Sequence, residues 1–73
     1  MKTLQTFRFD LALRYGLARA GMTQSDLARR LGISRQAVSL WMKSKSTSIT
    51  RVEQVSQALG IPMKKFIDLG KPE

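Results

Sequence analysis

The stretch from Met22 to Trp41 constrains the fold of this chain more than any other part of the sequence. It contains two short amphipathic segments joined by a three-residue hinge, Gly32-Ile33-Ser34. Thr23 precedes the first segment and Ser34 precedes the second, and each hydroxyl can cap a helix by accepting a backbone N–H. Because so short a hinge keeps the second segment against the first, the pattern predicts two helices that cross at a steep angle.

Apolar residues that recur at three- and four-residue spacing predict helices elsewhere as well. Gly21, Gly32 and Gly60 each follow such a segment and are typical helix stops. No alternation of apolar and polar residues over four or more positions predicts a strand, so we expect an all-α fold. The predicted helices are about Phe7–Ala20, Gln24–Leu31, Arg35–Lys43, Ile49–Leu59 and Met63–Leu69, followed by a frayed tail, Gly70–Glu73.

The apolar face of each predicted helix supplies the candidate core. Trp41 is in phase with Val38 and Met42, which predicts a core position for its indole. Gly16 lies inside the first helix, where glycine is unfavourable, and we expect a large neighbour to approach it, with Trp41 a candidate. The predicted core residues are Phe9, Leu13, Leu17, Ala20, Leu27, Ala28, Leu31, Val38, Trp41, Met42, Ile49, Val52, Val55, Leu59, Met63, Phe66 and Ile67.

The composition of the 73 residues bounds the class of protein. A chain of this length is one domain, and we expect it to span residues 1–73 with an ordered core over about residues 7–69. The sequence holds no Cys and no His, which excludes disulfides, zinc fingers and histidine-based catalysis. Paired carboxylates and a glycine-rich phosphate loop are missing too, so we expect a binding protein without metal or cofactor, not an enzyme.

The excess of basic residues points to a polyanionic partner. Thirteen Lys and Arg against five Asp and Glu give a net charge of +8. Such a surface can simply confer solubility, but the distribution is more informative than the total. Five basic residues and one acid lie between Thr23 and Lys45, which favours a nucleic acid at the predicted helix pair.

The second helix of the pair, over about residues 35–43, carries an exposed polar row that suits the major groove of DNA. Arg35 can donate two hydrogen bonds to guanine, and Gln36 can pair with adenine. Ser39 lies one turn further on and can donate or accept, while Leu40 can contact a thymine methyl or form part of a subunit contact. The alternative for Arg35 is a solvated or phosphate-bound side chain.

Other residues around the hinge are candidates for phosphate contacts. Gln24 opens the first helix of the pair, where free backbone N–H groups favour an anion, and its side chain can also brace Arg35. Lys43 and Lys45 follow the second helix, where the chain should pass the sugar-phosphate backbone. Arg29 and Arg30 are weaker candidates, because solvated charge explains them at least as well.

These residues resemble the Cro and phage-repressor family of helix-turn-helix proteins. In the run TQSDLARRLGISRQAVSLW, the shared positions are Gln24, Leu27-Ala28, Gly32 and Val38. The segment SITRVEQVSQALGI is similar to the fourth helix of the family, so the resemblance covers almost the whole chain. Where many relatives carry an aliphatic residue, this chain has Trp41, which implies local repacking.

The resemblance implies a compact five-helix, lambda-repressor-like domain that binds double-stranded DNA, commonly as a homodimer on a two-fold symmetric operator. It also implies base contacts from Arg35, Gln36, Ser39 and Leu40, and phosphate contacts from Gln24 and the lysines after the third helix. We therefore expect a small transcriptional repressor of phage, prophage or mobile-element origin that covers a promoter. Apolar residues near the C-terminus, Phe66, Ile67 and Leu69, either mediate dimerisation or close the monomer core.

Other readings of the sequence remain open. The same fold serves antitoxins and controllers of restriction systems, and it can also bind a polypeptide instead of DNA. No apolar run approaches the ~18 residues that span a bilayer, and the N-terminal MKTLQTFRFD is too polar for a signal peptide. We expect a protein of the bacterial cytoplasm or nucleoid, with no membrane partner and no small-molecule effector.

Overall fold

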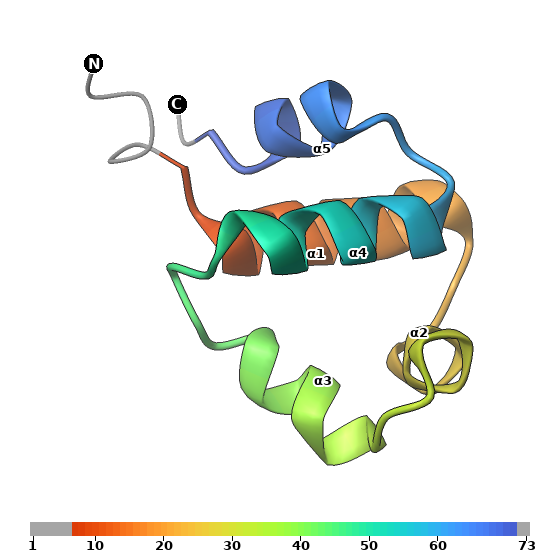
Figure 1. Cartoon of the computed structure of the whole chain (residues 1–73). Helices are drawn as coiled ribbons and strands as arrows, with labels where there is room; N and C mark the ends of the chain where they lie inside the picture. Colours follow the sequence, from red (N-terminus) through yellow and green to blue (C-terminus); the bar gives the residue numbers. More distant parts are fainter. Residues whose placement is uncertain (1–6, 72–73) are drawn as a thin grey trace.

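Five α-helices make up most of residues 7–71, the part of the chain that the computed structural model describes. α1 and α4 lie side by side in the middle, α5 covers them on one side, and α2 and α3 lie on the other (Figure 1). The expected all-α fold with five helices is confirmed. The helices are α1 (Phe9–Ala20), α2 (Gln24–Leu31), α3 (Arg35–Trp41), α4 (Ile49–Leu59) and α5 (Met63–Leu69).

The core forms where all five helices meet. Phe9 of α1 and Phe66 of α5 are fully buried, and their rings meet edge-on with centroids 6.3 Å apart. Val38 brings α3 into the same cluster, and Leu27 brings in α2. Burying an aliphatic or aromatic side chain of this size contributes about 1.5–3 kcal/mol, so these contacts hold the short helices in place.

Gly16 is approached by Leu59 and Phe66, not by Trp41 as the sequence suggested. A Cβ at position 16 would lie 2.9 Å from Cδ1 of Leu59 and 3.3 Å from Cε1 of Phe66. The glycine therefore lets α4 and α5 pack closely on α1, while Trp41 lies beside Phe9 at the start of that helix.

The predicted caps begin the helices around the hinge. The Thr23 hydroxyl accepts from the backbone N–H of Asp26 (3.1 Å), and the Asp26 carboxylate accepts from that of Thr23 (3.0 Å). Ser34 caps α3 by accepting from Ala37, and Ser48 caps α4. Gly32 ends α2 with a φ of 70°, a left-handed conformation that glycine adopts without strain. These local bonds set the direction in which each short helix leaves the hinge.

Both ends of the described chain differ from the sequence prediction. α1 begins at Phe9 rather than Phe7, because the extended Arg8 donates its backbone N–H to the carbonyl oxygen of Gly70 (2.7 Å). Gly70 is buried under Phe7, so the predicted tail begins as an ordered closure of the chain. Residues 1–6 and 72–73, which include most of the N-terminal run MKTLQTFRFD, lie outside the described residues.

The position of Ile49 also differs from the sequence prediction. The sequence predicts a core position, but 53% of the residue is exposed. It is the first residue of α4 and lies at the edge of the core, beside Phe7 and Ile67. The apolar spacing along α4 identified the buried face of the helix but not the point at which the core ends. α3 is also shorter than predicted and ends at Trp41.

The closure at Gly70 predicts a stability effect. In Gly70→Ala, the new Cβ would lie 2.7 Å from the backbone oxygen of Arg8 and 2.6 Å from the Phe7 ring. Because a backbone atom cannot move aside freely, we expect a loss of about 1–3 kcal/mol in the free energy of unfolding. Urea unfolding followed by circular dichroism measures it. Lys71→Ala, at the exposed neighbouring position, should stay within about 0.5 kcal/mol of the parent, and equal midpoints for both variants would contradict the closure.

Candidate nucleic-acid interface

The outer face of α3 presents the predicted reading residues to solvent. Arg35, Gln36 and Leu40 are exposed, and Leu40 is the most open large apolar residue of the helix, with 68% of it accessible. Val38, on the face opposite Gln36 and Leu40, is fully buried. The buried side of α3 holds the helix in place. Its exposed side carries the basic Arg35, the amide of Gln36 and the apolar Leu40, a combination that suits the edges of base pairs.

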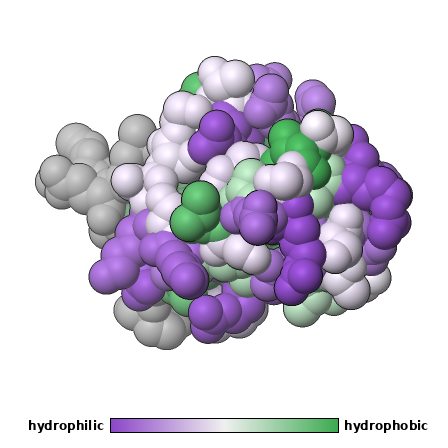
Figure 2. Space-filling model, turned by 90° about the horizontal axis from the view of Figure 1, so that it is seen from below, coloured by the Kyte–Doolittle hydropathy of each residue, from purple (hydrophilic) through white to green (hydrophobic). Residues whose placement is uncertain are grey.

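Figure 2 views the molecule from the side on which α2 and α3 lie. Most of this face is hydrophilic, and the hydrophobic side chains on it are isolated from one another. Single apolar side chains are normal on any protein surface, whereas contiguous apolar patches mark many protein contacts, and the described residues form no such patch on this face. The face therefore suits a nucleic acid better than an obligate protein partner.

Gln24 and Ser39 form a direct link between the two helices of the pair. The Ser39 hydroxyl donates to the side-chain oxygen of Gln24 (2.9 Å), and both residues are half-buried. From the sequence, Gln24 can also brace Arg35, but in the structure the side chain that it holds is Ser39, one turn further along α3. The bond joins the first residue of α2 to the exposed edge of α3.

The start of α2 also carries a negative charge. The bond from the Thr23 backbone lowers the pKa of Asp26 below its ordinary value, helped by the Thr23 hydroxyl and by Arg29. The ionised carboxylate pairs with Arg29 at 3.2 Å. The charge of Arg29 is thus partly neutralised by Asp26 on the same helix. Arg29 therefore attracts a polyanion less strongly than an unpaired arginine would.

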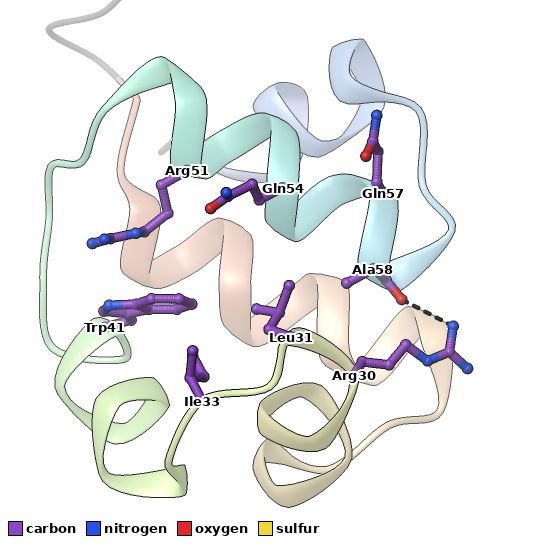
Figure 3. Close-up of a pocket in the computed structure, with 8 residues that line it drawn as sticks. All are labelled: Arg30, Leu31, Ile33, Trp41, Arg51, Gln54, Gln57 and Ala58. Carbon is purple, nitrogen blue, oxygen red and sulfur yellow. Dashed lines mark hydrogen bonds between the residues drawn. The ribbon is translucent and has the colours of Figure 1, made fainter.

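Arg30 is directed away from α3. Its guanidinium donates to the backbone oxygen of Ala58 near the end of α4 (3.3 Å), across the groove between α2 and α4 (Figure 3). Arg30, one of the two weaker phosphate candidates, therefore lies toward α4 and not beside α3. The two ends of α2 thus face different elements. Gln24 at its start contacts α3, whereas Arg30 near its end contacts α4.

Trp41 lines the same groove and is only partly buried. Its ring lies 6.1 Å from that of Phe9, between centroids, and packs against the core. The guanidinium carbon of Arg51 lies over the same ring, 4.5 Å from its centroid (Figure 3). This cation–π contact joins the end of α3 to α4 and was not anticipated from the sequence.

Lys43 and Lys45 lie in the chain that follows α3, and both are exposed. Two turn hydrogen bonds follow the end of α3, from the N–H of Lys43 to the carbonyl of Leu40 and from the N–H of Ser44 to the carbonyl of Trp41. The Lys45 carbonyl oxygen accepts from the backbone N–H of Phe9 (3.1 Å). The Ser44 hydroxyl donates to the carbonyl of Ser46 (2.7 Å). The backbone that carries the two lysines is thus anchored to the start of α1.

Comparison with known proteins identifies the class. A family model described as helix-turn-helix matches residues 13–66, so the chain belongs to the Cro/C1-type helix-turn-helix family. The crystal structure of NHTF, a hypothetical transcription factor from Neisseria, is similar, with a TM-score of 0.68 and 29% sequence identity over 94% of this chain and 79% of that chain. No curated protein matches the chain.

The family and the fold together make this protein a DNA-binding regulator. The helix pair of the family corresponds to α2 and α3, whose crossing leaves the outer face of α3 uncovered. Within residues 7–71, no helix is both long and apolar enough to span a membrane.

Proposed function

We propose that this protein is a sequence-specific repressor that places α3 in the major groove of double-stranded DNA. The observation that carries the proposal is the exposed row of Arg35, Gln36 and Leu40 on a capped helix whose other face is buried. An α-helix fits the width of the major groove, and the first residues of a recognition helix meet the base edges first. Polar side chains at the start of α3 are therefore in the right place to read bases.

Each base-reading residue has a distinct chemical role in this proposal. Arg35 donates to O6 and N7 of guanine, and Gln36 pairs with N6 and N7 of adenine. Ser39 contacts a neighbouring base, and Leu40 packs on a thymine methyl group. Direct contact with base edges distinguishes sequences, whereas the phosphate contacts only position the protein.

Phosphate contacts come from both sides of α3. Gln24 has its side-chain oxygen bound to Ser39, so its amide N–H groups are the atoms available to a phosphate. Lys43 and Lys45 approach the backbone from the anchored segment after α3. Arg29 contributes less because of its pairing with Asp26, and Arg30 reaches a phosphate only if it leaves the Ala58 carbonyl.

The regulatory mechanism that we propose is occupancy of a promoter by a homodimer on a palindromic operator. Two copies would read half-sites about one helical turn apart, roughly 34–36 Å. Phe66 is fully buried in the monomer and Ile67 and Leu69 are half-buried, so the candidate dimer surface is smaller than the sequence suggested. A phage or prophage origin is an extension of the same proposal and rests on the family resemblance.

Selection of bound duplexes from a random pool tests sequence specificity and symmetry together. We expect an enriched motif that contains an inverted repeat with centres one helical turn apart, because two copies of α3 present the same residues to each half-site. A motif without internal symmetry would contradict binding as a homodimer and would indicate that a single copy recognises the DNA. Recovery of unenriched pool sequences at all salt concentrations would contradict specific recognition.

The salt dependence of binding separates DNA recognition from binding of a polypeptide partner. Lys43 and Lys45 of two subunits would neutralise four phosphates, which at about −0.9 per phosphate gives a slope of about −3.6 for log K against log salt. Fluorescence anisotropy with the selected duplex measures the slope. A protein that serves only as a protein-interaction module would show no duplex affinity even at low salt.

Arg35→Ala tests the assignment of the recognition helix. We expect a loss of about 1–3 kcal/mol of binding free energy on the selected site and relaxed preference at one base pair. Lys43→Ala is the matched phosphate variant and should weaken all sequences alike. Lys64→Ala, on α5 on the far side of the molecule, controls for loss of net charge (Figure 1). Uniform weakening by Arg35→Ala would make Arg35 a phosphate ligand and contradict its role as a base reader.

A further inference from the structure

We infer that Gln24 fixes the hydroxyl of Ser39 as a hydrogen-bond acceptor, so that Ser39 selects a base with a major-groove amino group, adenine or cytosine, at one position of each half-site. This inference rests on the proposed function, because it assumes that α3 enters the major groove. It makes Gln24 a positioning residue for specificity in addition to a phosphate ligand.

The first step is the hydrogen that Ser39 has to give. A serine hydroxyl has one O–H donor and two acceptor lone pairs, and it usually rotates to suit its partner. Here the single hydrogen is donated to the side-chain oxygen of Gln24 at 2.9 Å. Only acceptor lone pairs remain for a base in the groove.

The second step is the rigidity of the link. Both residues are half-buried, which protects the bond from competition by water. Gln24 is the first residue of α2, directly after the reciprocal caps between Thr23 and Asp26. α3 is fixed at its own start by Ser34. A serine within a helix can bond a carbonyl of its own preceding turn, as Ser56 does, but the Ser39 hydroxyl bonds across to α2.

The third step is the pattern of groups in the major groove. Adenine presents the N6 amino group and cytosine presents the N4 amino group, both of which donate. Guanine and thymine present O6 and O4, which only accept and therefore face the Ser39 oxygen without a hydrogen between them. An acceptor at this place thus favours adenine or cytosine on the strand that Ser39 faces and disfavours guanine or thymine.

The fourth step concerns the other end of Gln24. Its oxygen is occupied by Ser39, so the two amide hydrogens point to other partners, and a phosphate is the partner that the start of α2 favours. The same side chain would then couple the grip on the backbone to the reading of a base. Removing the Gln24 side chain should therefore weaken phosphate binding and reduce the base preference. Replacing only its N–H donors should weaken phosphate binding alone.

The experiment compares selected motifs for the parent protein and for Ser39→Ala, Gln24→Ala and Gln24→Glu. The base pair whose preference is lost in Ser39→Ala identifies the position that Ser39 reads. We expect the parent to favour adenine or cytosine there by roughly fivefold to tenfold, the effect of one hydrogen bond. Gln24→Ala should reduce this preference to about twofold or less, because the freed hydroxyl can then also donate to guanine or thymine.

Gln24→Glu is the matched control for positioning. Its carboxylate still accepts from Ser39, so the preference for adenine or cytosine should persist, while the loss of the amide donors weakens binding to every duplex alike. Persistence in Gln24→Glu together with loss in Gln24→Ala is a result that damage to the fold or to the phosphate contact does not produce. Thermal unfolding by circular dichroism confirms that each variant is folded.

Three outcomes would overturn the inference while leaving the proposed function intact, provided that the parent still selects a motif. In the first, no position of the motif responds to Ser39→Ala. In the second, the parent prefers guanine or thymine at the position that responds. In the third, the preference is unchanged in Gln24→Ala. Failure of the parent to select any sequence would overturn the proposed function itself, and the inference with it.

Discussion

The orientation of α3 depends on the burial of Val38. α3 has seven residues, too few to be a stable helix in isolation, so its place and direction come from tertiary contacts. Val38 is fully buried in the same cluster as Leu27 of α2 and Phe9 of α1. Once this face is inside, Gln36 and Leu40, each two positions from Val38, lie on the opposite side of the helix and face outward. Arg35 is the first residue of α3 and is exposed at its start. The proposed reading surface is therefore a consequence of core packing.

Polar contacts then refine what the core has positioned. The bond from Ser39 to Gln24 links the outer edges of α2 and α3, and the Lys45 carbonyl anchors the chain after α3 to Phe9. On the other side of α3, Arg51 stacks on Trp41 and ties the end of the helix to α4. Each contact restricts the motion of α3 and of the side chains that it carries. Preorganisation of this kind reduces the conformational entropy lost on binding.

The local features of the fold were predictable because they depend on neighbours in sequence. Caps bridge residues three apart, and glycine stops depend on one backbone conformation, so Thr23, Ser34 and Gly32 could be assigned directly. Features that depend on distant residues were missed or mistaken. Gly16 faces α4 and α5 instead of Trp41, Ile49 lies where the core ends, and Gly70 closes on the start of α1. Periodicity reports which face of a helix is buried, but not what covers it.

Apolar spacing and capping chemistry are local properties, and they predict the five helices, the crossed pair and the exposure of Arg35, Gln36 and Leu40 on α3. Which of the candidate residues lie together depends instead on tertiary packing. It joined Gln24 to Ser39 across fifteen residues of chain and directed Arg30 to the Ala58 carbonyl on α4. Side chains that are close in sequence can leave a helix in opposite directions, and a hydrogen bond forms only where two elements bring a donor and an acceptor within about 3 Å. That distance is set by packing, which no local pattern records.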